Sequence, residues 1–353
     1  MSEMSQSDCA AVILAAGQST RMRSQLSKVL HPLCGRPIIR YITELVALIE
    51  ARPVIVVVGY QADKIQRELK DVAGVEFVYQ KEQLGTAHAV SQTRGILAEF
   101  SGTVLILNGD TPLLTPDELS GLIQFHQKMK ADCTLLSSDV PNPFGYGRIV
   151  RGEGGEVLGI VEEKDASSEQ KKITEINSGI YCFNARSLYA ALSKIDNHNA
   201  KGEYYLTDSV AILRREGKSV QALKAADYRT VLGINTRMDL AEASRIIRQR
   251  IATQLMESGV TLIDPDTTYI DYGIQVGQDT VIWPCCLIEG RSSIGRSCQI
   301  GPFCRIVDVV LEDEVRVEGG CFLRGGTIAA GSTVSIASQA CQDKGIERFF
   351  HQA

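Results

Sequence analysis

The stretch AAVILAAGQSTRM (10–22) decides the start of the fold, because an apolar run breaks there at a glycine. Residues 10–15 have the continuous apolar pattern of a strand that is buried on both faces. Gly17 ends the run, and Arg21 follows a few positions later. Since the ligands of parallel sheets bind beyond the carboxyl ends of the strands, the turn at Gly17 is a candidate functional loop.

The alternation of predicted strands and helices continues through the first two thirds of the chain. A helix follows Pro37 with its aliphatic side chains on one face, and a polar helix is expected at 62–70. Further buried strands are predicted at VIVVVG (54–59) and VLILNGD (104–110). This alternation predicts an α/β domain with a Rossmann-like, mainly parallel sheet that is covered on both faces.

A different pattern follows a helical stretch at 237–258, which Gly259 ends. Beyond it an aliphatic residue recurs every six positions, with two one-residue contractions, and a small residue follows most of them four positions later. This hexad repeat predicts a short left-handed parallel β-helix of about three and a half coils. The aliphatic positions are Val276, Ile282, Ile288, Ile294, Ile300, Ile306, Leu311, Val317, Leu323, Ile328 and Val334, and the small ones are Thr280, Cys286, Ser292, Cys298, Cys304, Val315, Cys321, Ser332 and Ser338.

The chain of 353 residues is long enough for two domains, and these patterns suggest where they divide. We expect an α/β domain at 8–235, a connecting helix at 236–258, the β-helix at 259–341 and a tail at 342–353.

The ten cysteines cluster toward the end of the chain, with six of them between Cys285 and Cys341. There is no CxxC pair, which disfavours a zinc ribbon or a thioredoxin-like motif. Cys286, Cys304 and Cys321 fall one coil apart on one predicted face, and Cys298 takes the same position on another. We interpret them as small apolar filler rather than metal ligands, because no histidine or carboxylate accompanies them.

Composition excludes several classes of function. The formal net charge of −5 argues against non-specific binding to nucleic acid or to an anionic membrane. No apolar run approaches the roughly 20 residues of a membrane span. The polar, acidic start of the chain does not have the pattern of a secretory signal, so we expect a cytoplasmic protein.

The glycine turn after residue 15 combines two features of a phosphate site. Its backbone N–H groups can point at phosphate oxygens, and Arg21 and Lys28 lie seven residues apart, where both can contact one polyphosphate. The spacing alone leaves an alternative open, since an ordinary strand-to-helix turn with two solvated cations has the same pattern.

LAAGQSTRM (14–22) and SKVLHPLCGRPI (27–38) closely resemble the signature of sugar-nucleotide pyrophosphorylases, in particular the family of bacterial N-acetylglucosamine-1-phosphate uridyltransferases. The resemblance extends to about residue 340, and its most specific motifs are EQLGTAHA (82–89) and GEYYLTD (202–208). Similar motifs appear in order at YQKEQLGTAHAV (79–90), LNGDTPLL (107–114), GYGRIVR (145–151), GIVEEKDAS (159–167), EINSGIY (175–181), NAKGEYYLTDSV (199–210) and GINTRMDL (233–240).

The resemblance implies a role for individual residues. Arg21 and Lys28 would be the catalytic contacts to the phosphates, and Asp110 and Asn235 would bind Mg2+. The remaining substrate residues would be Leu14, Ala15, Ala16 and Gly17 in the nucleotide loop; Gln80, Gly85 and Thr86 around uracil; Asn108 and Gly109 beside the metal; Gly147, Glu162 and Asn177 on the sugar; and Tyr204 and Thr207 near the sugar pocket.

Each of these assignments has a plainer alternative. Asp110 stands at a predicted strand tip, where a hard cation needs an oxygen ligand, but an Asp before Pro112 also forms turns. Asn235 by itself would pass for a loop residue, and Glu162 for a solvated charge. His31 and His88 show no ligand spacing, so we interpret the histidines as structural or exposed.

The sequence departs from the family pattern at three positions near the site. Ser27 replaces the proline usual before the loop lysine, Ser19 replaces a common second glycine, and Asn108 stands where tyrosine is frequent. A serine leaves φ free where proline would fix it. None of the three changes removes a charged group, so the resemblance still implies an active site.

The family enzymes are bifunctional, with an acetyltransferase site in later coils of the β-helix. Only Lys344, Arg348 and His351 stand in the tail here, and they do not reproduce that motif. We therefore expect a shortened member, a UDP-N-acetylglucosamine diphosphorylase that lacks acetyltransferase activity.

The expected substrates are UTP and N-acetylglucosamine 1-phosphate. Two alternatives remain: another hexose 1-phosphate as the acceptor, or a regulatory subunit without activity. A homotrimer through the β-helix is the expected assembly, with no nucleic acid or membrane partner.

Overall fold

The computed structural model describes residues 9–18 and 20–336, which form two compact units. The first unit comprises the chain up to His31 together with Pro37–Asp239. The second comprises Pro32–Arg36 and the chain from Leu240 onward. Ser19, Ser338 and the predicted tail at 342–353, with Lys344, Arg348 and His351, lie outside the described residues.

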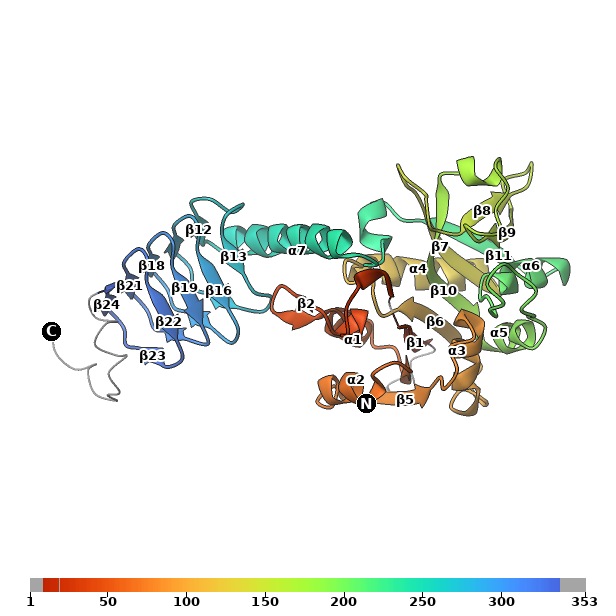
Figure 1. Cartoon of the computed structure of the whole chain (residues 1–353), viewed down its shortest axis with the longest axis horizontal. Coiled ribbons are helices and arrows are strands. Elements are labelled where there is room, and N and C mark those ends of the chain that lie inside the picture. The colour runs from red at the N-terminus through yellow and green to blue at the C-terminus, as the bar shows by residue number, and fades with distance from the viewer. Residues whose placement is uncertain (1–8, 19, 337–353) are drawn as a thin grey trace. The chain divides into compact units, whose positions relative to one another are not determined.

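The first unit contains a nine-stranded sheet in the order β11-β7-β10-β6-β1-β4-β5, with β8 and β9 attached beside β10 (Figure 1). The pairs β1–β4, β1–β6, β4–β5 and β7–β11 are parallel, and β10 is antiparallel to its neighbours. The strands are β1 Cys9–Ala15, β4 Val54–Val58, β5 Val75–Tyr79, β6 Thr103–Asn108, β7 Cys133–Asp139, β8 Arg148–Arg151, β9 Val157–Val161, β10 Glu175–Asn184 and β11 Val220–Lys224. The predicted Rossmann-like, mainly parallel sheet is confirmed.

Helices cover both faces of this sheet, as the continuous apolar strands require. Along β1, Ala10 and Val12 belong to one core with α3, α5 and α6, whereas Ala11 and Ile13 belong to another with α1, α2 and α4. The helices are α1 Ile38–Leu48, α2 Ala62–Glu68, α3 Thr86–Ser91, α4 Pro116–Met129, α5 Ala185–Leu192 and α6 Asp208–Arg215; short 3-10 turns are η1 Thr20–Met22, η2 Lys28–Leu30, η3 Gln92–Gly95, η4 Gln170–Lys172 and η5 Tyr228–Val231.

The predicted helical stretch after residue 236 is α7, Arg237–Glu257. Asp239 belongs to the first unit, and the helix from Leu240 onward belongs to the second. The second unit also contains most of the short hairpin made by β2 Pro32–Leu33 and β3 Arg36–Pro37. There the Tyr272 N–H donates to the Cys34 carbonyl (2.9 Å), and the Arg36 guanidinium lies 4.6 Å from the centre of the Tyr272 ring.

The rest of the second unit is the predicted left-handed parallel β-helix, in which three stacked sheets share one core (Figure 1). The sheets have the orders β12-β15-β18-β21-β24, β13-β16-β19-β22 and β14-β17-β20-β23. The strands are β12 Thr261–Leu262, β13 Tyr269–Ile270, β14 Gln275–Val276, β15 Val281–Ile282, β16 Leu287–Glu289, β17 Ser293–Ile294, β18 Gln299–Ile300, β19 Arg305–Val307, β20 Val310–Leu311, β21 Arg316–Val317, β22 Phe322–Arg324, β23 Thr327–Ile328 and β24 Thr333–Val334.

The strict hexad repeat starts at Val276, although the predicted bounds of the β-helix, 259–341, include the two strands β12 and β13 before it. Leu262 in β12 and Ile270 in β13 are both buried in the common core, but eight residues separate them instead of six. The extra residues form a turn in which Asp264 accepts hydrogen bonds from Thr267 and Thr268. The β-helix therefore begins one partial coil earlier than the strict repeat indicates.

The interpretation of the cysteines as core filler is confirmed for the described residues. Cys286, Cys298, Cys304 and Cys321 are buried free thiols in the β-helix core. Cys286, Cys304 and Cys321 immediately precede β16, β19 and β22, which are neighbours in one sheet.

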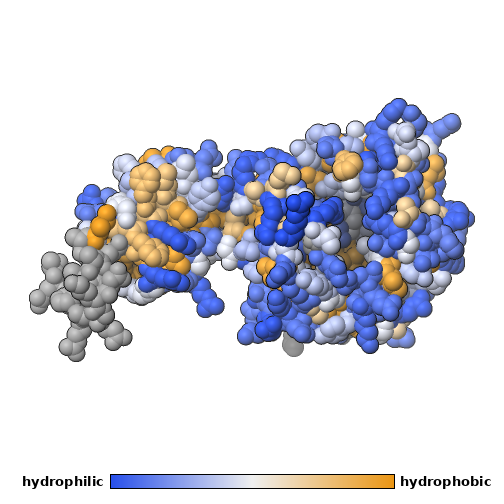
Figure 2. Space-filling view, viewed as in Figure 1, coloured by the Kyte–Doolittle hydropathy of each residue, from blue (hydrophilic) through white to orange (hydrophobic). Residues whose placement is uncertain are grey.

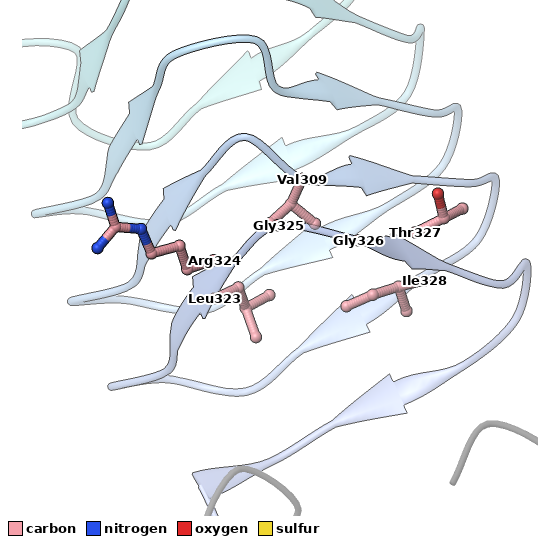
Figure 3. A pocket seen from close by; sticks show the side chains of 7 residues that line it. All are labelled: Val309, Leu323, Arg324, Gly325, Gly326, Thr327 and Ile328. Carbon is pink, nitrogen blue, oxygen red and sulfur yellow. The ribbon is translucent and has the colours of Figure 1, made fainter. Parts of the chain in front are cut away.

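The second contraction of the repeat coincides with an unusual turn between two strands of the β-helix. Leu323 and Ile328 are only five residues apart, and Gly325 (φ 67°) and Gly326 (φ 87°) both adopt left-handed backbone between them. Consecutive glycines permit this turn because they have no Cβ to clash. The shortened corner leaves a small hollow of about 50 Å3, lined by Val309 and the residues at 323–328 (Figure 3).

Within the described residues, none of the helices combines the length and the apolar character that crossing a membrane requires.

Candidate active site

Two neighbouring strands end together at the carboxyl edge of the first sheet. Leu14 in β1 pairs with Asn108 in β6, and the Gly109 N–H donates to the Leu14 carbonyl (2.9 Å). A Cβ on Gly109 would lie 3.1 Å from that carbonyl oxygen, so a larger residue would strain the junction. The predicted nucleotide loop at 14–17 and the metal candidate Asp110 are thus held side by side.

Four of the predicted residues meet in one cluster at this edge. The Lys28 ammonium forms an ion pair with Asp110 Oδ2 and donates to Asn235 Oδ1 (3.0 Å). Arg21 Nη2 donates to the same Asn235 oxygen (2.9 Å). The side chains of Lys28 and Asp110 are only 13% and 18% exposed, so this pair is well shielded from bulk water. The cluster joins residues up to 214 positions apart in the chain.

The start of α7 fixes Asn235 in this cluster. The Ile234 N–H donates to the Asp110 carbonyl (2.9 Å), which ties the segment before α7 to the tip of β6. Asp239 Oδ2 accepts from the N–H groups of Asn235 (2.9 Å) and Thr236 (2.8 Å), and Thr236 Oγ1 accepts from the Asp239 N–H. This is the reciprocal capping of a helix start, and it leaves the Asn235 side chain pointing at Lys28.

The donor set at the cluster fits Mg2+. Asp110 supplies a carboxylate oxygen and Asn235 a neutral amide oxygen, and both now contact the same ammonium of Lys28, which occupies the place of a cation between them. The described residues offer no cluster of three or more His, Cys, Asp or Glu side chains for a metal. Two protein oxygens suit a Mg2+ that keeps waters and takes its other ligands from phosphates.

Tyr146 is a residue near this cluster that the sequence reasoning did not single out. Burial, followed by the negative charges of Asp239 and Asp110, raises the pKa of its hydroxyl to about 12, against the positive charge of Arg21. The phenol is therefore a neutral hydrogen-bond donor near Asp110 and Arg21. Its place in GYGRIVR, beside Gly147, was the available signal.

The predicted uracil residues form a second group around α3. Gln80 is 4% exposed and donates through Nε2 to the Gly85 carbonyl (2.9 Å), with His88 Nδ1 3.2 Å away. Gly85 (φ 112°) packs on the chain at Tyr204, where a Cβ would lie 2.5 Å from the Tyr204 carbonyl oxygen. Thr86 Oγ1 accepts from the Leu206 N–H (3.0 Å).

The predicted sugar residues form a third group. A Cβ on Gly147 would lie 3.6 Å from both the Asn177 side chain and Glu162 Oε1, so the three are neighbours. Thr207 Oγ1 donates to Glu162 Oε1 (3.2 Å), and Asn177 Nδ2 donates to the Tyr181 hydroxyl (2.7 Å). Burial raises the pKa of Glu162, although the Thr207 hydrogen bond opposes the shift.

The third group differs in charge from the cluster of Arg21, Lys28, Asp110 and Asn235, which we call the phosphate cluster after its expected ligand. Burial and the neighbouring carboxylates Asp196, Glu162 and Asp165 raise the pKa of Asp208, next to Thr207, to about 6. Carboxylates such as these can accept hydrogen bonds from hydroxyl groups, whereas cations such as Arg21 and Lys28 can attract phosphate. The site therefore has a basic end and an acidic end.

Asn108, one of the departures from the family pattern, has a structural contact in this fold. Its Nδ2 donates to the Ser178 carbonyl (3.3 Å) across the β6–β10 pair. Gly179 (φ 79°) lies so close that a Cβ there would clash with this amide. The amide therefore braces β10 near Asn177.

The histidines expected to be structural or exposed include two with defined contacts. His31 is 4% exposed, and its Nδ1 lies 3.3 Å from Arg237 Nη1. His126 is also 4% exposed, with Nδ1 2.9 Å from Thr134 Oγ1.

The fold and the arrangement of charged groups define a nucleotidyltransferase. Residues 10–250 match the nucleotidyl transferase family, to which the chain belongs.

The chain also belongs to the family of proteins named bifunctional protein GlmU. It is 44% identical to the one from Geobacillus sp. strain WCH70, over 97% of this chain and 71% of the relative. It is 46% identical to that of Trichlorobacter lovleyi, over 92% and 71%, and 45% identical to that of Brevibacillus brevis, over 87% and 66%. The chain thus spans about two thirds of the length of these relatives.

Proposed function

We propose that this protein transfers a uridylyl group from UTP to N-acetyl-α-glucosamine 1-phosphate, giving UDP-N-acetylglucosamine and pyrophosphate. The observation that carries the proposal is the meeting of Arg21, Lys28, Asp110 and Asn235 at the edge of the sheet. Membership of the nucleotidyl transferase family and of the GlmU family supports the same chemistry.

In this proposal the chain binds and orients two phosphorylated substrates for an in-line displacement. The sugar phosphate oxygen attacks the α-phosphorus of UTP, and the bond to pyrophosphate breaks. Arg21 and Lys28 stabilise the negative charge that develops on the phosphate oxygens. Lys28 leaves its contacts with Asp110 and Asn235 for the phosphates, which frees both oxygens for a cation.

Asp110 and Asn235 would hold the Mg2+ ion, which supplies charge neutralisation on the phosphates when bound. The acidic end of the site, with Glu162, accepts hydrogen bonds from the sugar hydroxyls. No covalent intermediate on the protein is needed, since the phosphate oxygen of the sugar is itself the nucleophile.

The test is pyrophosphate release with UTP and Mg2+, run in parallel with N-acetylglucosamine 1-phosphate and glucose 1-phosphate. We expect turnover with the N-acetylated sugar to exceed that with glucose 1-phosphate. Preference for glucose 1-phosphate would replace the proposed acceptor by another hexose. No pyrophosphate with either sugar would favour a regulatory subunit.

For the polypeptide of these 353 residues we retain the prediction that it does not acetylate glucosamine 1-phosphate. A general base must be held within hydrogen-bond reach of the amine, and the family positions for that base are not matched in this sequence. Release of coenzyme A from acetyl-CoA, measured beside pyrophosphate release on one preparation, tests this. Coenzyme A release that depends on glucosamine 1-phosphate would contradict the prediction.

We further propose that the protein is a homotrimer through its β-helix. Tyr269 and Leu287 are neighbours on the outer face of one sheet and are 46% and 38% exposed. Phe322, 51% exposed, lies on the same face beyond Arg305, which separates it from Leu287. A hollow of about 330 Å3 lies beside Tyr269 and Leu287. Figure 2 shows apolar side chains gathered over the β-helix on the face in view. Exposed apolar faces of this kind are typical of protein interfaces. Light scattering that shows a monomer over a wide concentration range would overturn this proposal.

A further inference from the structure

Gln61 has a backbone conformation that is unfavourable for its type. It stands between β4 and α2 as the N-cap of the helix, with φ 55° and ψ 36°. For a residue with a Cβ this left-handed region has a higher free energy than the right-handed one, whereas glycine adopts it without this cost. Its side chain makes no capping hydrogen bond to the helix. The strain therefore needs another compensation.

The compensation lies in the segment that leads to Lys28. Gln61 Oε1 accepts a hydrogen bond from the Ser27 N–H (2.9 Å), and Gln61 Nε2 donates to the Gln25 carbonyl (2.6 Å). The neighbouring Tyr60 hydroxyl donates to the same carbonyl (3.0 Å). The Gln61 amide thus makes hydrogen bonds to the backbone on both sides of Leu26. We call the two hydrogen bonds of the Gln61 side chain the Gln61 clamp.

The Gln61 clamp ends one residue before the lysine of the phosphate cluster. Ser27 is 1% exposed, and its carbonyl accepts from the Leu30 N–H (2.9 Å) in the 3-10 turn η2, which begins at Lys28. The path and pitch of that turn decide where the Lys28 ammonium lies. In this position the ammonium contacts Asp110 and Asn235.

Ser27 itself cannot fix this turn. Its φ of −55° and ψ of 137° are values that proline also adopts. Serine has no ring to fix φ at this value, as proline has. Its hydroxyl is buried without a hydrogen-bond partner in the described part of the chain, so the side chain does not anchor the segment. A proline at this position would have no N–H to give to Gln61. The clamp and a proline are therefore alternative ways to hold the same backbone.

We propose that Gln61 is a positioning residue for Lys28, and that its two hydrogen bonds to the 25–27 backbone take over the restraint that a proline at position 27 would supply. Its effect on turnover rests on the proposed uridylyl transfer. Its effect on the order of the loop does not depend on that function.

The central experiment combines Gln61→Gly and Ser27→Pro in a double-mutant cycle. Gln61→Gly relieves the backbone strain and removes the clamp, so we expect the melting temperature to stay the same or rise while kcat falls about tenfold, the scale of losing two net hydrogen bonds. Ser27→Pro should keep kcat within about twofold. In the Ser27→Pro background, Gln61→Gly should then have almost no further effect on kcat. A tenfold loss in both backgrounds, or none in either, would overturn the proposal.

Limited trypsin digestion without substrates separates this inference from the proposed function. Without the clamp, cleavage after Arg23 and Lys28 should speed up about tenfold, since these bonds must leave the folded loop to be cut. Cleavage after the exposed Lys128 and Lys130 at the end of α4 is the internal control. Wild-type cleavage rates in Gln61→Gly would overturn the clamp even if uridylyl transfer is found. Faster cleavage in a protein without pyrophosphate release would support the clamp and count against the proposed function instead.

Discussion

The two units of this protein are built from contacts of different kinds, repeated ones in the β-helix and contacts between distant residues in the nucleotidyltransferase unit. In the β-helix, paired positions such as Ile282 and Ile300 are one coil apart, and every coil repeats the same buried contact. In the nucleotidyltransferase unit, Lys28 contacts Asn235 across 207 positions of the chain. A repeat can be recognised from its period, whereas a site assembled over such distances exists only when the sheet has formed. This difference predicts that a substitution in the β-helix can lower the stability of that unit without changing the turnover that depends on the other unit.

The largest effect is expected at Asp110, where all the distant contacts meet. Asp110→Ala removes the charged oxygen expected to hold Mg2+, so pyrophosphate release should fall by about a hundredfold or more. Asp117→Ala, an exposed carboxylate in the first turn of α4, is the matched control and should leave turnover unchanged. Near-normal turnover of Asp110→Ala at saturating Mg2+ would show that the metal assignment is wrong.

The next effect belongs to the β-helix. Ile300 is fully buried in the β-helix core, so Ile300→Ala should lower the free energy of unfolding of that unit by about 3 kcal/mol. Pyrophosphate release should stay within about twofold, because the phosphate cluster belongs to the other unit. Calorimetry and the activity assay measure the two effects, with Gln299→Ala at the neighbouring exposed position as the control. A loss of turnover in Ile300→Ala that accompanies the loss of stability would contradict the prediction that the two units are independent.

Acid should weaken the nucleotidyltransferase unit through His126. Burial lowers the pKa of this imidazole from 6.5 to about 4, although Asp132 opposes the shift. The unfolded chain therefore binds more protons between pH 6.5 and 4, and stability is lost as the pH falls through that window. From pH 7 to pH 5 the loss is about 2 kcal/mol.

Urea unfolding at both pH values, for the wild type and His126→Gln, isolates this contribution. The variant should lose less stability on acidification than the wild type, because its side chain does not titrate. Equal pH dependence of the two proteins would contradict the assignment.

The smallest effect is expected at the acidic end of the site. Glu162→Gln keeps the shape of the side chain but weakens its hydrogen bonds to sugar hydroxyls, so KM for the sugar phosphate should rise about tenfold. KM for UTP should change less than about twofold. Glu156→Gln, an exposed residue outside the site, is the control. An equal rise in both KM values would place Glu162 elsewhere in the site.

The sequence by itself determined the classes of structure in both units. Continuous apolar strands such as residues 10–15 predicted a sheet buried on both faces, and the hexads from Val276 predicted the β-helix. Both patterns are local, since burial of a strand or of a coil position leaves its mark on neighbouring residues. Where the spacing becomes irregular, as between Leu262 and Ile270, the hexad pattern does not locate the individual strands, although the predicted bounds of the β-helix include them.

The tertiary structure alone decided which polar groups work together. The motifs named Arg21, Lys28, Asp110 and Asn235, but only the packing of the α7 start against β6 brings them into one cluster. Tyr146 and Gln61 gave no periodic signal, because their importance comes from charges and backbone groups far away in the chain. Hydrogen bonds and charges act over a few ångströms in space regardless of sequence separation, so contacts of this kind are fixed only in the folded protein.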